Sequence, residues 1–264
     1  MRILVTGLSG FIGSSLGPFL EARGHEVRGA GRDVTALTEA LPGCDAVVHL
    51  ANIAHARVAA ELLRRVNVEG TLRAAESAAR AGVRRFVYLS SLKARERDDE
   101  YGHAKLAAER ALQELKSPME IVILRPPLVY GPRVRANFLA LMRAIARGWP
   151  LPLASIENRR SLVYVGNLCD AVASCVESAA AAGKTFYVAD GEALSTPALC
   201  RAIGDAVGRP ARLFRFPPEL LPLSKLKDSL VVDDAALRDE LGWKPPFSFE
   251  EGLSATAAWY RNRL

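Results

Sequence analysis

The sequence has little cysteine, little histidine and no long uncharged hydrophobic run. Its four cysteines are scattered, and no two have the spacing of a metal-binding or redox pair, which favours buried free thiols in a reducing compartment. The four histidines form no metal-ligand pattern, so we expect no metal site. The longest apolar stretches are interrupted by His, Arg or Pro, and no charged segment precedes a long apolar one at the N-terminus. We therefore expect no signal peptide, no transmembrane helix and a cytoplasmic protein.

Long runs of like charge are also absent. Lys and Arg number 35 against 29 Asp and Glu, and the excess is spread along the 264 residues. We therefore expect no nucleic-acid partner, whereas the mild basicity suits an anionic small ligand. With 50% hydrophobic and 24% charged residues, the composition is that of an ordinary globular protein with a large core.

Short apolar segments alternate with helical patterns over the first half of the chain. This alternation predicts an α/β fold with a Rossmann-type, doubly wound parallel sheet. After Leu124 the pattern changes to proline-rich turns around isolated helices, which indicates a smaller, interleaved C-terminal substrate lobe. We assign residues 1–125, joined by about 161–190, to the dinucleotide-binding domain, and residues 126–160 and 191–264 to the substrate-binding lobe. The expected strands of the first domain are 3–5, 26–30, 45–50, 86–89, 121–124 and 186–189, and its expected helices include 58–81, 101–116 and 168–182.

The segment TGLSGFIG follows the first expected strand directly and opens a helix. Gly7 would allow the tight turn, Gly10 would let the backbone approach a pyrophosphate, and Gly13 would let the helix pack on the strand. Phe11 and Ile12 would then present N–H groups of the helix N-terminus to the phosphates. In this context the spacing predicts a dinucleotide site.

The second expected strand ends in GAGRD. An acidic residue about 20 positions after the glycine turn usually holds the ribose hydroxyls of NAD, and an arginine there accommodates the 2′-phosphate of NADP. Here Arg32 stands close to that position, which favours NADP. The alternative is that Arg32 is a solvated loop charge and Asp33 takes the role of the acid, which would favour NAD.

Tyr101 and Lys105 have the spacing YxxxK. On a helix, positions i and i+4 share a face, so the lysine would lower the pKa of the phenol and suit it to proton transfer near neutrality. Ser91 ends the strand RRFVYLSS, where a hydroxyl would face the ligand crevice of an open α/β sheet.

Taken in order along nearly the whole chain, these segments resemble the extended short-chain dehydrogenase/reductase family, in its nucleotide-sugar epimerase/dehydratase branch. The matching segments are TGLSGFIG, DAVVHLAN, VNVEGT, FVYLSS, YGHAK, LRPPLVYGP, RRSLVYVGNLCDAV and DELGWKPPFSFEEGL. The resemblance implies Tyr101 as the acid/base, Ser91 as its hydroxyl partner, and Lys105 as a ligand of the nicotinamide ribose. It also implies cofactor contacts at Leu50 and Ala51. A homodimer is a possible assembly of this chain.

The resemblance assigns three further residues. Asn67 matches an asparagine that supports the active-site backbone. Asn137 and Arg160 match positions that contact the nucleotide diphosphate, and a forked guanidinium suits that group. Either Arg159 or Arg160 could be a solvated charge instead.

The chain departs from the family pattern in three places. Residues 31–44 are too few for the usual additional strand, so we expect GHEVRG near a sheet edge and one short helix at about Thr35–Leu41. The loop between Ser91 and Tyr101, which covers the sugar in family members, is also short. Leu92 and Lys93 stand where 4,6-dehydratases carry an Asp-Glu pair, so dehydration is not expected.

We therefore expect an NAD(P)-dependent enzyme that transfers hydride at C4 of a nucleoside-diphosphate sugar. Reduction of a 4-keto sugar is the first hypothesis, because an arginine at the ribose suggests an exchangeable NADP. A 4-epimerase with tightly held NAD is the alternative. A non-catalytic dinucleotide sensor ranks last, because such sensors commonly lose the tyrosine or the lysine.

Overall fold

The computed structural model describes residues 1–30, 34–53, 59–95, 100–220 and 228–263. The chain divides into two units, each described by itself below. The first comprises Met1–Pro126, Leu168–Val188 and Asp234–Lys244, and the second Pro127–Asn167, Ala189–Asp233 and Pro245–Leu264. The sequence-based division differs at four places: residues 161–167 and 189–190 lie in the second unit, and Pro126 and residues 234–244 lie in the first.

The first unit contains a six-stranded, wholly parallel sheet in the order β2-β1-β3-β4-β5-β8. This is the doubly wound sheet that the alternating pattern predicts. The prediction of an edge strand at GHEVRG is confirmed, because β2 pairs only with β1 in this order. The strands are β1 (Arg2–Thr6), β2 (Glu26–Gly29), β3 (Ala46–His49), β4 (Arg85–Leu89), β5 (Glu120–Arg125) and β8 (Thr185–Tyr187).

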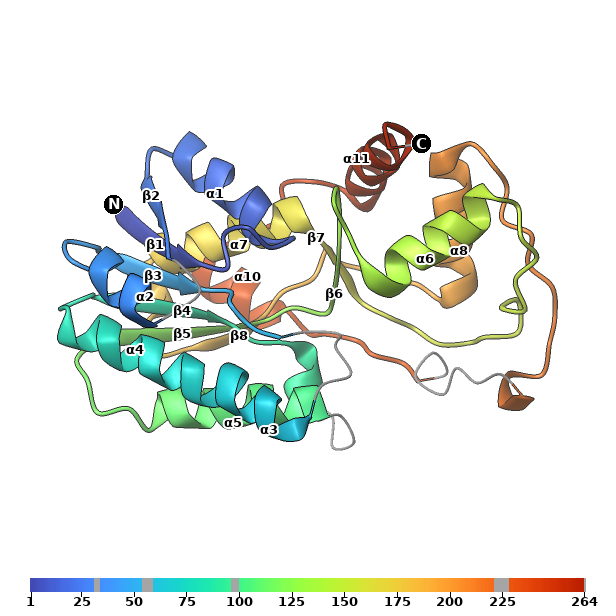
Figure 1. Cartoon of the computed structure of the whole chain (residues 1–264). Coiled ribbons are helices and arrows are strands. Elements are labelled where there is room, and N and C mark those ends of the chain that lie inside the picture. The colour runs from blue at the N-terminus through green and yellow to red at the C-terminus, as the bar shows by residue number, and fades with distance from the viewer. Residues whose placement is uncertain (31–33, 54–58, 96–99, 221–227, 264) are drawn as a thin grey trace. The chain divides into compact units, whose positions relative to one another are not determined.

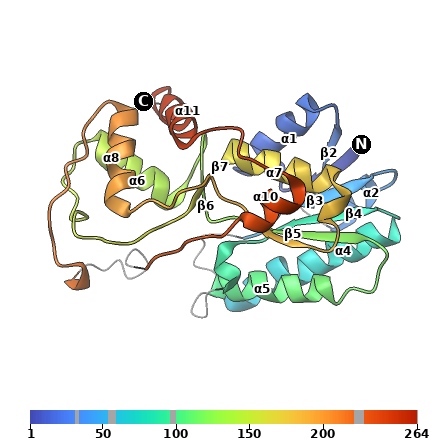
Figure 2. The same cartoon turned by 180° about the vertical axis from the view of Figure 1, so that it is seen from behind.

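Helices cover both faces of this sheet (Figures 1 and 2). One face packs its apolar side chains, such as Leu4, Phe86 and Ile123, against α2, α4 and α5. The helices α1 and α7 lie over the other face. Because both faces are covered, β3 and β4 are buried along their whole length. The helices are α1 (Gly13–Ala22), α2 (Val34–Ala40), α4 (Gly70–Arg80), α5 (Glu100–Gln113), α7 (Val165–Glu177) and α10 (Ala235–Leu241).

The short connection after β2 behaves as expected over its described part. Within residues 34–44 the structure has the single helix α2 and no strand. The helix expected at Val58–Ala81 is more complex. It begins as α3 (Ala60–Leu63), continues as the π-helical turn η1 (Arg64–Glu69) and ends as α4. Turns of this π-helical type are rare in proteins, and those that occur are often found at functional sites.

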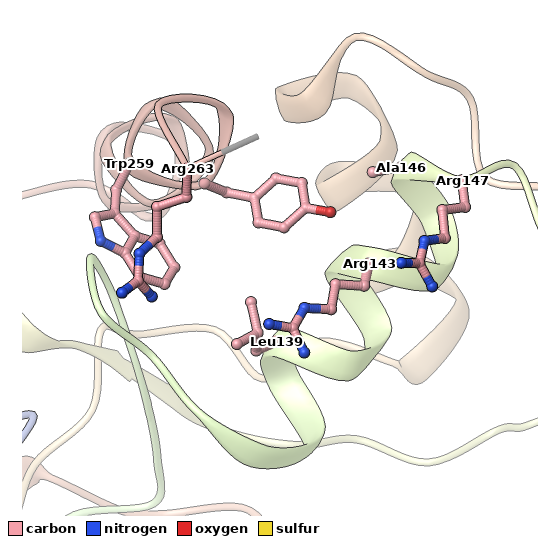
Figure 3. A pocket seen from close by; sticks show the side chains of 7 residues that line it. Leu139, Arg143, Ala146, Arg147, Trp259 and Arg263 are labelled. Carbon is pink, nitrogen blue, oxygen red and sulfur yellow. The ribbon is translucent and has the colours of Figure 1, made fainter.

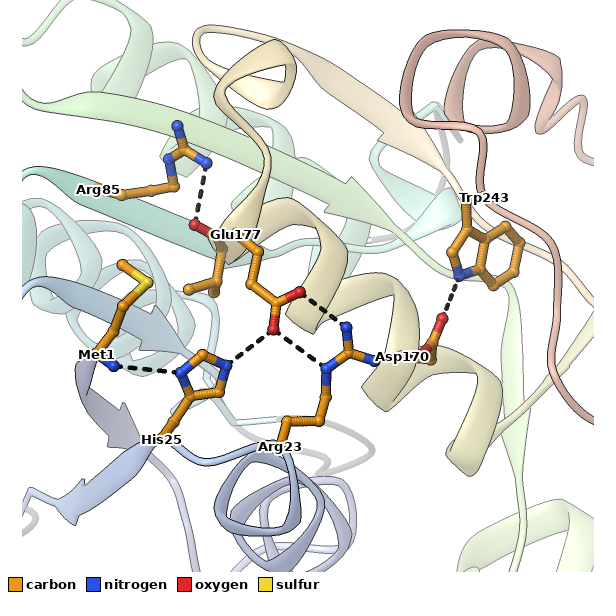
Figure 4. A network of polar contacts seen from close by, with 8 residues as sticks. Met1, Arg23, His25, Arg85, Asp170, Glu177 and Trp243 are labelled. Carbon is orange, nitrogen blue, oxygen red and sulfur yellow. Dashed lines mark hydrogen bonds and ion pairs between the residues drawn. The ribbon is translucent and has the colours of Figure 1, made fainter.

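A polar network joins α7 and α10 to the beginning of the chain within the first unit (Figure 4). Arg23 binds Glu177 through Nε and Nη2, at 3.1 and 2.8 Å, and Asp170 through Nη1 at 3.0 Å. Trp243, which follows α10, donates its indole N–H to Asp170 at 2.9 Å. The Trp243 bond and the ion pair of Glu240 in α10 with Lys184 connect residues 234–244 to the first unit, although more than forty residues of the second unit precede them in the sequence.

The second unit is built around two short parallel strands, β6 (Leu128–Tyr130) and β7 (Leu162–Tyr164). The sequence did not predict β6. Asp190 holds the two strands together, because it accepts the backbone N–H of Tyr164, the hydroxyl of Tyr130 and the side-chain amide of Asn167. The helices of this unit are α6 (Ala136–Ala146), α8 (Thr196–Val207) and α11 (Phe249–Arg261).

The described residues also form the short 3₁₀ turns η2 (Leu92–Arg95), η3 (Ala179–Ala181) and η4 (Pro218–Leu220). In the part of the chain that the structure describes, no helix has the length and hydrophobicity that crossing a bilayer requires.

Candidate active site

The glycine turn lies between the end of β1 and the start of α1. Gly7 has φ of +74°, and a Cβ placed on it would lie 3.0 Å from the backbone nitrogen of Ala51. The N–H of Gly10 donates to the Gly7 carbonyl at 2.9 Å. A Cβ on Gly13 would lie 2.3 Å from that same carbonyl oxygen, so only glycine lets α1 begin directly on the turn.

This turn fits the diphosphate of a dinucleotide. Ile12, the N-cap of α1, makes no side-chain capping bond, and the first turn carries no acidic residue. The free N–H groups and the positive end of the helix dipole therefore remain for an anion. Phe11 and Ile12 are half-buried in the turn, and Leu50 and Ala51 follow β3 beside it.

A buried polar relay runs from β1 to η1 beneath this turn. The Thr71 hydroxyl donates to the Asn67 carbonyl at 2.8 Å, so it accepts from Nε2 of His49 at 3.2 Å. Nδ1 of His49 then carries no proton and accepts from Thr6 Oγ1 at 2.9 Å, and Thr6 accepts the N–H of Ala51 at 3.2 Å. Burial, with a smaller effect from the Lys105 charge, lowers the pKa of His49 to about 3. The imidazole is therefore neutral, as this hydrogen-bond pattern requires.

Asn67 uses its side chain to hold the backbone that follows β3. It is completely buried, donates to the Ile53 carbonyl at 3.0 Å and accepts the Ile53 N–H at 2.8 Å. The π-helical turn η1 carries Asn67. Asn67 thus holds the backbone at Ile53 in place, and its role in the active site stays a prediction.

The side chain of Lys105 is hydrogen-bonded to the end of β4. It is 1% exposed, and its ammonium donates to the carbonyl of Leu89 at 2.8 Å. Its Nζ atom lies 4.6 Å from the ring centre of Tyr88 and 5.9 Å from that of Tyr101. Burial lowers the pKa of Lys105 to about 7, and the charge of Glu109 acts in the opposite direction.

Ser91 follows β4 and immediately precedes the turn η2. Its Oγ accepts the N–H of Lys93 at 3.2 Å, and its carbonyl accepts the N–H of Ala94 at 3.0 Å. A Cβ on Gly102 would lie 2.2 Å from the carbonyl oxygen of Lys93, so η2 packs directly on α5 beside Tyr101. The structure therefore brings Ser91, Tyr101 and Lys105 to the C-terminal end of β4. Sequence reasoning did not recognise that the glycine within YGHAK permits this contact.

Sequence reasoning also missed a buried charge network next to Lys105. Glu109 lies one turn after Lys105 and is 1% exposed. It accepts both Nε, at 2.9 Å, and Nη2 of Arg125, and it accepts the hydroxyl of Ser90. Arg125 also donates to the hydroxyl of Tyr187 at 2.7 Å. The ends of β4, β5 and β8 are thus tied to α5. The i+4 spacing of Lys105 and Glu109 was the only available sequence signal.

The residues assigned to the nucleotide diphosphate belong to the second unit. Asn137 is exposed in the first turn of α6. Arg160 is half-buried, and its backbone exchanges hydrogen bonds with Leu194 at 2.8 and 2.9 Å. Arg159 is different, because its side chain is 61% exposed and pairs with Glu192 at 3.1 Å. Of the two neighbouring arginines, Arg159 is the surface charge.

Several sequence predictions concern cofactor choice, metals and thiols. Arg32 and Asp33, on which NADP and NAD were weighed, lie outside the described residues. All four cysteines are free and buried, as expected, and burial raises the pKa of Cys169, Cys175 and Cys200 to about 12. Among the described residues, no cluster of three or more His, Cys, Asp or Glu side chains could hold a metal ion.

Comparison with known proteins agrees with this geometry. A model of the NAD dependent epimerase/dehydratase family matches residues 3–189. The chain is 34% identical to the UDP-glucose 4-epimerase of Vibrio cholerae, over 97% of this chain and 94% of that protein. It is 30% identical to the UDP-glucose 4-epimerase of Mycolicibacterium smegmatis, over 100% and 99%.

A solved structure shows the shared fold. MoeE5 in complex with UDP-glucuronic acid and NAD superposes on this chain with a TM-score of 0.84, at 24% identity and with 100% of both chains covered. The family match covers the whole glycine turn, the Ser–Tyr–Lys residues and the parallel sheet that holds them. This chain therefore belongs to the NAD dependent epimerase/dehydratase family of enzymes.

Proposed function

We propose that this protein is an NAD-dependent 4-epimerase of a nucleoside-diphosphate sugar. The observation that carries the proposal is the position of Lys105, whose ammonium bonds the end of β4 and lies beside the Tyr101 ring. This arrangement suits proton transfer at a carbinol held above the sheet edge. Epimerisation is favoured over other reactions because two relatives that match nearly the whole chain are named UDP-glucose 4-epimerase.

The residues of the first unit would hold the dinucleotide. The turn from Gly7 to Gly13 would receive the diphosphate, and Lys105 would bind the nicotinamide ribose. The bound nicotinamide supplies an acceptor and donor of two electrons at the sugar carbon. The side chains of the protein would then remove the proton from the sugar oxygen and return it.

Tyr101 would take the proton from the C4 hydroxyl as that carbon is oxidised, and would return it when the carbon is reduced on its opposite face. Ser91 would hydrogen-bond the same oxygen and keep it within reach of the phenol. A protonated Lys105 lowers the pKa of the phenol and so makes it an effective base near neutrality. Leu92 and Lys93 offer no carboxylate for elimination of water.

Arg160 and Asn137 would hold the diphosphate of the sugar nucleotide. A half-buried guanidinium provides charge-assisted bonds of fixed geometry to phosphate oxygens. Arg160→Ala should therefore raise the dissociation constant of UDP by about tenfold or more, as the loss of a charged hydrogen bond implies. Calorimetric titration would measure this change, and Arg159→Ala, which alters the exposed neighbour, is the matched control.

Reduction of a 4-keto sugar with NADPH is the second candidate. The observation in its favour is Arg32, placed close to the position that reads the 2′-phosphate of NADP. Arg32→Ala should weaken NADP binding much more than NAD binding if this reading is right. Equal affinities for both cofactors in the native protein, unchanged by the substitution, would remove the support for the reductase.

One assay separates the two candidates. The purified protein is offered UDP-glucose, UDP-N-acetylglucosamine and a 4-keto-6-deoxy sugar nucleotide, each with and without NADPH, and the products are identified by NMR. Formation of the C4 epimer without net consumption of NADPH supports the epimerase. Stoichiometric consumption of NADPH with the keto sugar, and no epimer from either UDP-sugar, would establish the reductase instead.

Tyr101→Phe tests the mechanism common to both candidates. The ring remains but the transferable proton is lost, so turnover should fall by about 10²-fold or more. Binding of the dinucleotide, followed by fluorescence, should persist because the glycine turn and Lys105 are intact. Full activity of this variant would contradict the role of Tyr101.

A further inference from the structure

The second unit contains a basic cavity that the proposed reaction does not use. It lies between α6 and α11 and has a volume of about 310 Å³ (Figure 3). None of the residues assigned to the dinucleotide or to the sugar nucleotide lines it. Its lining residues are Leu139, Arg143, Ala146, Arg147, Trp259, Tyr260 and Arg263.

Among the described residues that line this cavity, three carry a guanidinium group and none carries a side-chain carboxylate. Elsewhere arginines are commonly paired with acids, as in Arg23 with Glu177 and Arg125 with Glu109. Among the ion pairs of the described residues, none involves Arg143, Arg147 or Arg263. Three like charges around one concavity raise the local positive potential, which an anion would relieve.

Aromatic rings orient two of these guanidinium groups. The Arg263 guanidinium lies 5.0 Å from the ring centre of Trp259, and that of Arg147 lies 5.4 Å from the ring centre of Trp149. Stacking engages the flat face of a guanidinium and leaves the N–H donors at its edge free to bind an oxyanion. The rings thus hold the charges in place without neutralising them.

Capping of α6 does not account for these arginines. A basic residue near a helix C-terminus commonly binds the last carbonyl groups. Here Arg209, which follows α8, does so: it donates to the carbonyl of Ala146 at 3.1 Å. Arg143 and Arg147 are therefore available for another partner.

We propose that this cavity binds a small phosphate-bearing molecule. Its phosphoryl oxygens would lie against Arg143 and Arg263, and its apolar part would contact Leu139 and Ala146. The forked donors of arginine match phosphate geometry, which favours this class over a singly charged carboxylate. A concave site of this volume suits a small ligand, whereas nucleic acid or a membrane would need an extended basic surface.

The test uses pyrophosphate as the probe and the complete chain in a low-salt chloride buffer. The protein has only three tryptophans, so its indole N–H signals in ¹⁵N NMR spectra can be assigned by substitution. The Trp259 signal should shift saturably with pyrophosphate, while the signal of Trp243, in the first unit, should not. This readout is local and does not depend on catalytic activity.

Variants then test which charges are responsible. Arg143→Ala and Arg263→Ala should each raise the dissociation constant seen at Trp259 by about tenfold. Arg143→Lys, which keeps the charge but loses the fork, should weaken binding to an intermediate degree. Arg201→Ala, which removes an exposed charge of α8, should leave the constant within about twofold.

Other outcomes would overturn the proposal. These are the absence of a saturable shift at Trp259, equal weakening by Arg201→Ala and Arg143→Ala, or loss of the shift only in Arg160→Ala. A further outcome would also overturn it: the protein co-sediments with phosphatidylglycerol vesicles in a way that depends on Arg143, while pyrophosphate does not shift the Trp259 signal. That result would indicate that the arginines bind a membrane surface.

Discussion

The two units use arginine in opposite ways. In the first unit, Arg85 is completely buried, binds Glu120 at 3.0 Å and donates to the carbonyl groups of Cys175 and Val176 at the end of α7. In the second unit, Arg143 and Arg147 are exposed and line a cavity whose described lining residues include no acidic side chain. Burial of a charge is costly unless it is paired, so the buried arginines are structural. The exposed Arg143 and Arg147 have no such requirement and remain available for a ligand.

The largest expected effect comes from breaking a buried pair of the first unit. Glu109→Ala would leave the Arg125 guanidinium without its carboxylate and Ser90 without its acceptor. The free energy of unfolding should fall by about 3–5 kcal/mol, as is typical when one partner of a buried ion pair is removed. Urea unfolding followed by circular dichroism measures it. Glu114→Ala, at an exposed position beyond α5, should change it by less than about 0.5 kcal/mol.

The second prediction concerns space in the glycine turn. In Gly13→Ala, the new methyl group would meet backbone at 2.3 Å, so the turn must shift. Stability should fall by about 1–3 kcal/mol, and dinucleotide binding should be lost. Gly70→Ala is the matched control, because its methyl group would lie 3.6 Å from the Arg65 carbonyl oxygen and stability should rise slightly. Equal behaviour of the two variants would disprove the steric argument.

The third prediction concerns acid stability and the buried His49. Its pKa is about 3 in the folded protein, below its ordinary value of 6.5, so the unfolded chain binds the extra proton first. Its contribution to stability is complete above pH 6.5 and is lost as the pH falls toward 3. At pH 5 the loss should be about 2 kcal/mol.

Urea unfolding at pH 7.5 and 5.0 measures this dependence. His49→Gln should flatten it, whereas His103→Gln, at an exposed position of α5, should not. If the dependence were the same in all three proteins, His49 would not be the titrating group.

The smallest expected change in stability comes from an exposed ion pair of the second unit, and it tests the comparison between buried and exposed arginines. The pair of Arg159, 61% exposed, with Glu192, 84% exposed, is a surface ion pair. Arg159→Ala should reduce stability by about 0–1 kcal/mol, and less in high salt, because water and ions already screen the pair. A loss comparable to that of Glu109→Ala would contradict the distinction between buried and exposed arginines.

Features with a local cause could be predicted from the sequence. The glycine spacing predicts a tight turn because only glycine tolerates positive φ and close backbone contact, and Gly7 and Gly13 show both. The YxxxK spacing predicts that Tyr101 and Lys105 share a helix face because helix periodicity is fixed. The shortness of residues 31–44 predicts β2 at the sheet edge, since too few residues remain for another crossover.

Features that depend on distant pairing could not be predicted in this way. Glu109 and Arg125 are ordinary charged residues in the sequence, and their partnership requires that α5 and the end of β5 meet. The strand β6 is recognisable only through its pairing with β7, 34 residues later. The π-helical turn at Asn67 likewise departs from the regular helical pattern of its own segment.

The sequence by itself determined the order of elements, the parallel sheet, the glycine turn and the identity of the Tyr–Lys pair, because each follows from spacing along a few residues. Only the tertiary structure decided three further features. The Lys105 ammonium donates to the Leu89 carbonyl, residues Asp234–Lys244 pack in the first unit, and Arg143 and Arg263 line one cavity. These facts depend on how segments that are distant in the sequence pack together, and no local pattern of residues specifies that packing.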